Sequence, residues 1–415
     1  MKSVLLVLDE IPVLNTTGHT TYNNAFLTAL VASGFEVTML ITGNRFVKPV
    51  FNVDEDIGVS GVNCVIPAAF KLRGNSFIGK PIGLAKWLLR RPVISKIRRS
   101  SARSNNIYIG NWLSTSAAAK FAVGLVGRNF DYVFIDTIFR YEVIKHLPKN
   151  ICSILVGHDV FHQRCVSLDS VGLNPLPFVT IEQERQVLAN FDGVIAITAE
   201  EALIYESLLP ECRVIALPSP IETRVSVAIR CSKPRVLYVA SRAQINVDGL
   251  IWFLDSIWPK VKERHPEAVL DVVGSIGPEL RRVDPGVCVH GRVDDYSVIA
   301  SQAMCAINPI RAGSGLKIKM LDYFSYGLGC ITTPAGAAGF PPDDESPIAV
   351  AADDAEFAAL LNSWLANSTL CHQQSERAIR YVQQFSPESF ARRLCCWIHA
   401  LGSNAAHELS TGKAP

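Results

Sequence analysis

The chain has 415 residues, 49% of them hydrophobic, and carries 40 basic against 38 acidic side chains. This length predicts two domains, and a formal charge of +2 excludes a globally basic nucleic-acid binder. The short apolar run Val4 to Leu8 meets Asp9 too soon for a signal peptide, and no stretch predicts a transmembrane helix, so we expect a cytoplasmic protein. Eleven cysteines without a Cys-x-x-Cys pair indicate reduced thiols and no zinc site.

The first half of the sequence alternates short apolar runs with helical stretches. Val4 to Leu8 predicts a strand, Pro12 to Thr20 a turn-rich loop, and the spacing from Tyr22 to Leu30 a helix that Gly34 ends. Further strands are predicted at Phe35 to Ile41, Tyr132 to Ile135, Ile151 to Val156, Val194 to Ile197 and Val214 to Leu217. Fully apolar strands between helices indicate a parallel sheet covered on both faces.

The pattern stops after Leu217 and restarts at Arg235, so residues 218–234 are interpreted as a linker. Strands are then predicted at Val236 to Ala240, Ala268 to Val273, Val287 to His290, Met304 to Asn308 and Cys330 to Thr332. The predicted fold class is α/β, with two Rossmann-like domains, 1–217 and 235–385, facing across a cleft. Residues 386–415 are expected to form a helix and tail that pack back on the first domain. Neither half has an intact G-x-G-x-x-G, which disfavours a dinucleotide-dependent redox enzyme.

The stretch from Asn308 to Gly327 is the richest in chemistry. A predicted strand ends there in a loop of small residues, Gly313-Ser314-Gly315, which opens a helix over Leu316 to Tyr326. Such a loop directs free backbone N–H groups and the positive helix end toward a phosphate. Lys319 and Asp322 are three residues apart and share a helix face, whereas Lys317 would face elsewhere.

From Arg235 to Phe385 the sequence resembles the second half of glycosyltransferase family 4, retaining enzymes of the GT-B fold. The motifs that carry the resemblance are Val236-Leu237-Tyr238-Val239-Ala240-Ser241, Asn246-Val247-Asp248-Gly249-Leu250, Val272-Val273-Gly274, Val289-His290-Gly291-Arg292-Val293, Gly313-x-Gly315 with Lys319-x-x-Asp322, and Gly336 and Gly339. The resemblance implies that 235–385 binds a nucleotide-sugar donor and that 1–217 lies on the acceptor side.

The resemblance also implies roles for single residues of the donor half. Lys319 and Arg242 would hold the donor diphosphate beside the Ser314-Gly315 loop. Asp322 would accept hydrogen bonds from the ribose hydroxyls. The backbone near Arg292 and Val293 would meet the base. Ser314 stands where many members of the family have Glu, and Asp322 is one methylene shorter than the usual Glu.

In the acceptor half, the resemblance points to two short segments. Gly18 and His19 match the N-terminal glycine loop near the reacting sugar, although Ser, Thr and Gly residues there could equally cap the helix. His158 follows a predicted buried strand, at a position where the family has a histidine near the transferred sugar. It could contact the sugar or steer the acceptor, and a purely structural histidine is the alternative.

Retention in this family implies that basic side chains and a helix end stabilise the departing diphosphate, so we expect no metal ion and no cofactor. The run Asp54-Glu55-Asp56 matches the Asp-x-Asp metal signature of the other major glycosyltransferase fold. It stands in a polar setting, and we interpret it as a chance match.

Residues 71–103 contain ten Lys or Arg and no Asp or Glu, interleaved with apolar residues and Trp87. This pattern suits an anionic membrane surface, which would place the protein peripherally on the inner face of the membrane and fit a lipid-linked acceptor. A solvated face is the alternative. A nucleic-acid patch lacks any supporting motif.

Two other functions remain open at this point. A nucleotide-sugar 2-epimerase of the same architecture would act on the donor without an acceptor and would need more acidic residues near the sugar. A non-catalytic nucleotide-sugar-binding subunit is the second, because Ser314 replaces a common Glu.

Overall fold

The computed structural model describes residues 2–13, 18–43, 50–79, 116–127, 129–173, 178–224, 234–280, 284–293, 295–313, 315–340 and 345–410, without the side chains of 116–118 and 402–410. These residues form two compact units. Unit 1 comprises residues 1–165, 175–218 and 390–415, and unit 2 comprises residues 166–174 and 219–389. No described helix is long and apolar enough to cross a membrane.

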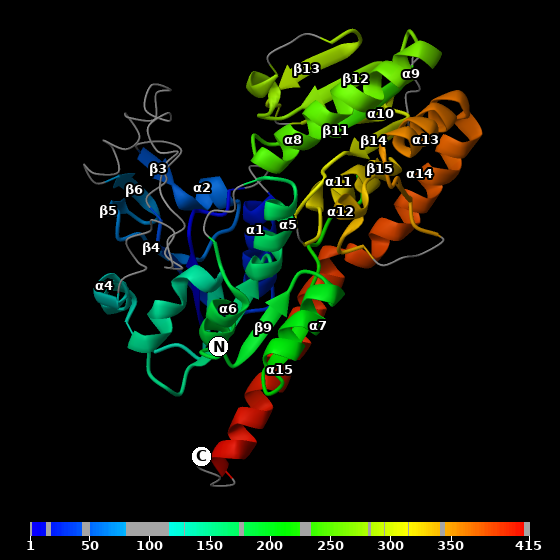
Figure 1. The fold of residues 1–415 in the computed structure, drawn as a ribbon. Coiled ribbons are helices and arrows are strands. Elements are labelled where there is room, and N and C mark those ends of the chain that lie inside the picture. The colour runs from blue at the N-terminus through cyan, green and yellow to red at the C-terminus, as the bar shows by residue number, and fades with distance from the viewer. Residues whose placement is uncertain are drawn as a thin grey trace. The chain divides into compact units, whose positions relative to one another are not determined.

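Unit 1 is built on a parallel sheet of seven strands in the order β10-β9-β8-β7-β1-β2-β4. Two of these strands, β4 and β9, are labelled in Figure 1. The strands are β1 (Ser3–Leu8), β2 (Glu36–Ile41), β4 (Asn63–Val65), β7 (Tyr132–Asp136), β8 (Cys152–Gly157), β9 (Gly193–Ala196) and β10 (Arg213–Ala216). The central strands are buried on both faces, which confirms the interpretation of their continuous apolar runs.

Helices cover both faces of this sheet. They are α1 (Gly18–Ala32), α4 (Ser116–Val126), η2 (Ile138–His146), α5 (Phe161–Ser170), α6 (Ile181–Leu188), α7 (Ala199–Leu208) and α15 (Pro387–Ser410). The N-terminus of α5 is capped by the buried Glu184, whose carboxylate accepts from the backbone N–H groups of Phe161 and His162.

The last helix, α15, completes the core of unit 1 although it comes from the far end of the chain. The ring of Phe390 packs edge-on against Tyr22 and Phe26 of α1, with centroids 5.8 and 6.4 Å away. Further along α15, the backbone carbonyl of Ile398 accepts from the Tyr132 hydroxyl at 3.4 Å. One face of α1 is therefore covered by the C-terminal helix.

A second, antiparallel sheet in unit 1 was not predicted. It has three strands in the order β3 (Val50–Asn52), β6 (Ser76–Gly79) and β5 (Ala69–Arg73). The helix α2 (Val53–Ile57) follows β3, and Asn52 caps its N-terminus. The acidic run Asp54 to Asp56 forms the first turn of α2, a position that favours negative charge.

Unit 2 contains a parallel sheet of six strands in the order β13-β12-β11-β14-β15-β16. The strands are β11 (Arg235–Val239), β12 (Val269–Val273), β13 (Val287–Gly291), β14 (Cys305–Asn308), β15 (Cys330–Thr332) and β16 (Ile348–Val350). The helical segments are α8 (Gln244–Trp252), η3 (Phe253–Ile257), α9 (Trp258–Arg264), η4 (Gly277–Glu279), α10 (Ser297–Gln302), α11 (Ile318–Ser325), α12 (Pro334–Ala337), α13 (Asp354–Ala366), α14 (Ser368–Val382) and η5 (Gln383–Phe385).

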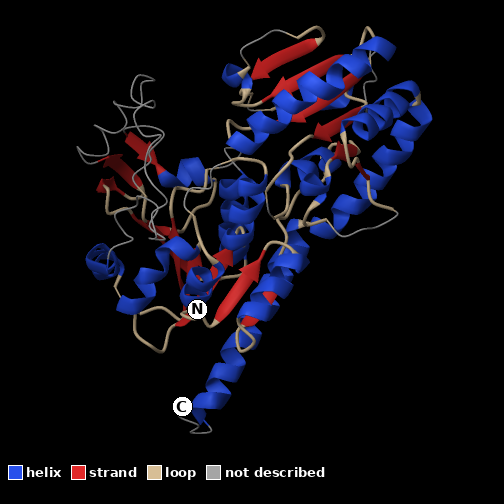
Figure 2. Ribbon diagram, in the orientation of Figure 1, coloured by secondary structure: helices blue, strands red, loops and turns tan. Residues whose placement is uncertain are grey.

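The strands of unit 2 carry two separate cores, because successive side chains point to opposite faces. Val236 and Tyr238 of β11 belong to the core beneath α8, α9 and α13, whereas Leu237 belongs to the core beneath α11 and α14. Helices and sheet therefore form three layers, as Figure 2 shows for this unit. With the parallel sheet of unit 1, this confirms the predicted α/β class with two Rossmann-like sheets.

Of the predicted linker, residues 218–234, the structure describes residues 218–224 and Pro234. Ser219 and the residues after it belong to unit 2. There, the backbone N–H of Ile221 donates to Phe385 and that of Arg224 to Ser325.

Candidate functional site

Each parallel sheet has one point at which the strand order reverses. In unit 1 the chain leaves β1 for β2 on one side and returns to β7 on the other; in unit 2 the reversal separates β11 from β14. The loops at the carboxyl ends of the two flanking strands diverge there, and open α/β sheets bind their ligands in the resulting crevice. Both reversal points carry predicted site residues.

At the reversal point of unit 1, Asp136 joins the two predicted histidines. Asp136 ends β7 and is fully buried. Its Oδ1 lies 3.0 Å from Nε2 of His19, in the first turn of α1, and 2.9 Å from Nε2 of His158, directly after β8. The two imidazole rings meet edge to face with centroids 4.2 Å apart. The structure thus brings His19 and His158 together through a carboxylate that sequence reasoning missed.

The charges in this cluster are distributed unequally. Burial alone would lower the pKa of His19, but the Asp136 carboxylate outweighs it and raises that pKa above its usual value. Burial and the neighbouring His19 lower the pKa of His158. Burial would raise the pKa of Asp136, yet the two histidines hold it well below its usual range. The cluster therefore favours an ionised Asp136 and protonation of His19 before His158.

The backbone that presents Asp136 is held in an unusual conformation. Thr137 has a φ of 64°, and it is the one non-glycine residue with positive φ in the described chain. The buried Arg140 secures it by donating from Nη1 to the Asp136 carbonyl at 3.1 Å and to Thr137 Oγ1 at 2.7 Å. The other terminal nitrogen of Arg140, Nη2, forms an ion pair with Asp9 at the end of β1. Strained backbone fixed in this way is characteristic of functional sites.

Gly18 is the first residue of α1 and is exposed, one position before His19. The preceding residues 14–17 lie outside the described part of the chain. On the same helix, Oδ1 of the buried Asn23 lies 3.1 Å from His158 Nε2. Asn23 is a second residue of this cluster that the sequence did not single out.

At the reversal point of unit 2, the loop after β14 contains Gly313 and Gly315, whose φ values are 126° and 69°. Side chains rarely adopt these conformations, so glycine is required at both positions. Ser314 lies outside the described residues. Positive φ turns backbone N–H groups in directions that ordinary turns do not, as in anion-binding loops.

Lys319, in the first turn of α11, follows this loop and is half-buried. Its Nζ donates to Oδ1 of Asn246 on α8 at 2.8 Å and lies 5.0 Å from the centre of the Tyr238 ring. Burial lowers the pKa of Lys319 to about 7. No carboxylate contributes to the pKa of this side chain, and an anionic ligand would stabilise its charged form.

The prediction that Lys317 faces away was wrong in its geometry. Lys317 is the N-cap residue of α11 and has non-helical backbone angles, so a helical projection does not apply to it. It is buried, and its Nζ donates to the Gly315 carbonyl at 2.5 Å. Its charge contributes to the lowered pKa of Lys319. Lys317 thus belongs to the glycine loop itself.

The other residues predicted to bind the donor lie on loops after β11 and β13, and two of them already contact other residues of the protein. Arg242, after β11, is exposed and forms an ion pair with Glu279 at 2.6 Å. Arg292, after β13, is exposed, and the half-buried Val293 packs against the core beneath α11.

Asp322 is held by two residues that sequence reasoning did not identify. Arg224 donates to its Oδ1 at 2.8 Å, and the hydroxyl of Tyr296 donates to its Oδ2. Burial raises the pKa of Asp322 to about 6, and Arg224 opposes that shift. A ribose hydroxyl would have to share or replace these two contacts.

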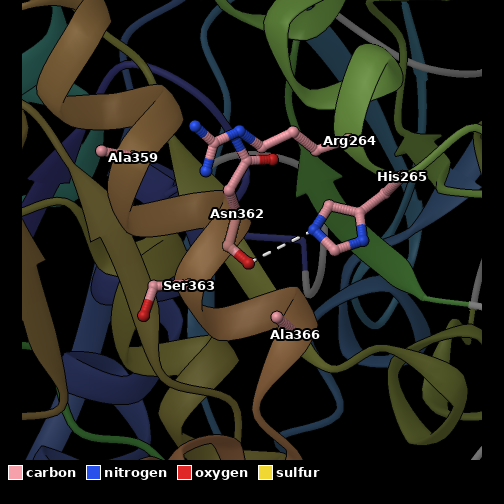
Figure 3. Close-up of a pocket in the computed structure, with 6 residues that line it drawn as sticks. All are labelled: Arg264, His265, Ala359, Asn362, Ser363 and Ala366. Carbon is pink, nitrogen blue, oxygen red and sulfur yellow. Dashed lines mark hydrogen bonds between the residues drawn. The ribbon is translucent and has the colours of Figure 1, made fainter.

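A surface pocket of about 340 Å³ lies elsewhere in unit 2 (Figure 3). Its lining residues are Arg264, His265, Ala359, Asn362, Ser363 and Ala366. They come from the last turns of α9 and α13, and α9 leads directly into the amino end of β12. The pocket is thus at the edge of the sheet opposite to the one where such folds bind ligands, and we do not assign it to the donor.

Residues 233–367 match the family model for glycosyl transferases group 1. Over 285 residues the chain is 21% identical to an uncharacterized 44.6 kDa protein in the cps region of Klebsiella pneumoniae; the alignment covers 62% of this chain and 71% of that protein.

Solved structures of the GT-B fold superpose on nearly the whole chain. Sucrose-phosphate synthase from Thermosynechococcus elongatus gives a TM-score of 0.70 at 15% identity, covering 97% of this chain and 100% of that one. A variant of S. aureus TarM in complex with fondaparinux, alpha-GlcNAc-glycerol and UDP gives 0.68 at 11% identity, with the same coverage. At these identities the likeness establishes the fold.

Proposed function

We propose that this chain, a GT-B glycosyltransferase whose residues 233–367 form a group 1 glycosyltransferase domain, transfers a sugar from a nucleotide-diphosphate donor to a glycan, glycolipid or other acceptor. Transfer proceeds with retention of configuration and without a metal ion. The observation that carries the proposal is the half-buried Lys319, which follows the Gly313–Gly315 loop at the reversal point of the sheet in that domain. The TarM variant, which shares the fold, was solved with UDP.

The donor diphosphate is held by Lys319 and by backbone N–H groups of the Ser314-Gly315 loop, with Arg242 exchanging its half-buried partner Glu279 for phosphate. Asp322 accepts from the ribose hydroxyls, and the backbone at Arg292 and Val293 meets the base. Charge that develops on the departing diphosphate is then stabilised by lysine and loop dipoles, so that the leaving group requires no metal. On the acceptor side, His158 and His19 contact the reacting sugar or the acceptor hydroxyl, and Gly18 allows close approach.

Product analysis tests this function directly. With a nucleotide sugar selected by thermal shift from a panel, we expect a glycoside only when acceptor is present, with its anomeric configuration retained by NMR. The rate should be unchanged in excess EDTA, because lysine and loop N–H groups supply the positive charge. Isomerised or hydrolysed donor in the absence of acceptor would indicate the epimerase instead. Donor binding without turnover would indicate a non-catalytic subunit. Inhibition by EDTA that Mn²⁺ reverses would indicate a metal-dependent mechanism.

Donor affinity should depend on pH through Lys319. The free protein holds the pKa of this residue at about 7, and a bound diphosphate favours the charged form. Below pH 7 the dissociation constant should therefore be nearly constant, and above pH 7 it should rise roughly tenfold per pH unit, because binding then requires uptake of a proton. Calorimetry in buffers of different ionisation enthalpy measures that proton directly. A nucleotide sugar is the suitable probe, since its diphosphate does not titrate in this range, and a flat profile with no proton uptake would contradict the assignment.

We further propose that the stretch 71–103 attaches the protein to an anionic membrane, as a lipid-linked acceptor would require. Residues 80–103 lie outside the described part of the chain. At the start of the stretch, Lys71 and Arg73 of β5 are exposed, and so are the neighbouring Phe70 and Leu72, which are 54% and 58% exposed. Cationic and apolar side chains on one exposed strand suit the interface of a charged bilayer.

The protein should co-sediment with anionic vesicles and not with neutral ones. Each Lys or Arg near the surface contributes about 1 kcal/mol, and salt should weaken binding because exposed charges are screened within about 10 Å at 0.1 M. Replacing Arg90, Arg91, Arg98 and Arg99 together by Gln should release the protein and leave donor binding intact. If the fourfold variant sediments like the wild type, the stretch is a solvated face and a soluble acceptor becomes the better candidate.

A further inference from the structure

The cluster of His19, Asp136 and His158 at the reversal point of unit 1 has more hydrogen-bond acceptor oxygens than N–H donors. Nε2 of His158 faces two oxygens, Oδ1 of Asp136 at 2.9 Å and Oδ1 of Asn23 at 3.1 Å. One N–H hydrogen must serve both. The second carboxylate oxygen of Asp136, Oδ2, is buried without a hydrogen-bond partner in the described structure. Buried oxygens of this kind usually have a partner, so the cluster is incomplete as a purely hydrogen-bonded network.

The same atoms are arranged as metal ligands would be. His19, Asp136 and His158 are the one group of three or more metal-ligating side chains that converges within 4.8 Å in the described chain. Zinc bonds of about 2.0–2.1 Å at tetrahedral angles place ligand atoms about 3.3 Å apart. The nitrogen to oxygen separations of 2.9 and 3.0 Å require only small displacements to reach that value.

The solvent exposure of the cluster and the chemistry of its three side chains indicate which metal ions it could bind. The side chain of His19 is 30% exposed, whereas those of His158 and Asp136 are 7% and 0% exposed, so the cluster opens to solvent on the His19 side. Two imidazoles and one carboxylate with one open position form the ligand set of reactive zinc sites, and they suit Zn²⁺ and Co²⁺ better than Mg²⁺ or Ca²⁺.

We propose that His19, Asp136 and His158 bind a divalent transition-metal ion of the Zn²⁺ class, and that occupancy inhibits the enzyme. The ion replaces the hydrogen bonds of both histidines and fills the position that the acceptor side requires. The inhibitory part rests on the proposed function; the binding part does not. Such a site is distinct from a metal-assisted leaving group, since it lies in unit 1, whereas the donor residues belong to unit 2.

Binding is tested on protein without an affinity tag, by titrating Zn²⁺ in competition with a chromophoric chelator and in the absence of any nucleotide sugar. We expect one equivalent to bind tightly and to raise the melting temperature. Asp136→Asn should weaken this binding at least tenfold, and so should His19→Gln, which changes a partly exposed residue and spares the buried core.

Two control variants exclude simpler sources of binding. His372→Ala removes an exposed histidine that pairs with Glu376 at 3.5 Å, and Cys288→Ser/Cys396→Ser removes two exposed thiols. Both should bind Zn²⁺ as the wild type does. If either control lowers affinity as much as His19→Gln does, or if Asp136→Asn and His19→Gln bind normally while melting cooperatively, the site is overturned.

Inhibition is measured separately. Zn²⁺ should reduce transfer by the wild type, EDTA should restore it, and His19→Gln should retain its own residual rate in Zn²⁺. Tight binding without inhibition would leave the metal site in place and overturn its effect on transfer. An absence of transfer under every condition would instead count against the proposed function.

Discussion

Replacing Lys319 by methionine should weaken donor binding at least tenfold and at the same time stabilise the free protein. A charged contact to a diphosphate is worth about 1.5–3 kcal/mol, so the dissociation constant of the nucleotide sugar should rise at least tenfold and turnover should fall with it. The opposite effect on stability follows from burial, because the pKa of Lys319 is lowered from 10.5 to about 7 by folding.

The sign follows from proton binding. Between pH 7 and 10.5 the unfolded chain holds a proton on this lysine that the folded protein does not, so the free energy of unfolding falls as the pH falls through that range. At pH 7.5 a neutral side chain of similar length removes this cost. After allowance for the lost hydrogen bond to Asn246, we expect a gain on the order of 1–3 kcal/mol.

Thermal or urea unfolding and nucleotide-sugar calorimetry on the same preparation measure both quantities. Lys260→Met is the matched control, because this lysine lies on α9 in the same unit, is 45% exposed and pairs with Asp354. It should change donor affinity little and stability by a few tenths of a kcal/mol. If the Lys319→Met protein binds donor normally, Lys319 does not contact the diphosphate. If the variant is strongly destabilised, the charged Lys319 side chain stabilises the fold of the wild type.

The second large effect concerns His158. His158→Ala should lower kcat by about 100-fold or more while donor affinity stays within a factor of two, because its contacts are made to the reacting sugar or the acceptor. Initial rates and nucleotide-sugar affinity must be measured together, since either alone would not separate chemistry from binding.

A purely structural role predicts a different outcome. His158 is buried against Tyr22, with ring centroids 5.1 Å apart, so the alanine variant also removes packing. His158→Asn keeps a polar side chain near Asp136, and His372→Ala serves as an exposed histidine control. If His158→Asn folds cooperatively and turns over at the wild-type rate, His158 returns to the structural interpretation.

Much of the fold could be predicted because its strands are buried on both faces. In runs such as Val4 to Leu8, polar and apolar residues do not alternate as they would in a strand with one face in solvent. The structure has β1 over Ser3–Leu8. The short strands β3, β5 and β6 were missed, because exposed residues such as Phe70 and Leu72 interrupt any periodicity. The helical stretch after β11 is not one regular helix: α8 and α9 are joined by the π-helical turn η3, with Pro259 near the start of α9.

The candidate sites divide in the same manner. Lys319 and His158 were identified because each stands directly beside a recognisable strand end or glycine loop. Asp136 was missed although it also ends a strand, because its importance depends on His19, which is 117 residues away in sequence. Asn246, Arg224 and Tyr296 likewise act through long-range contacts. Lys317 was misplaced since the helix begins one residue after it.

The origin of α15 constrains how the protein can be synthesised and folded. Phe390, which covers Tyr22 and Phe26 of the first helix, is translated after the whole of unit 2. Domains generally fold as units in order of synthesis, yet unit 1 cannot close its core until α15 has been translated. The residues of unit 2 from Ser219 to Ser389 are all translated before that moment. During this interval the nascent chain exposes the aromatic face of α1, and it is then that a chaperone would be needed most.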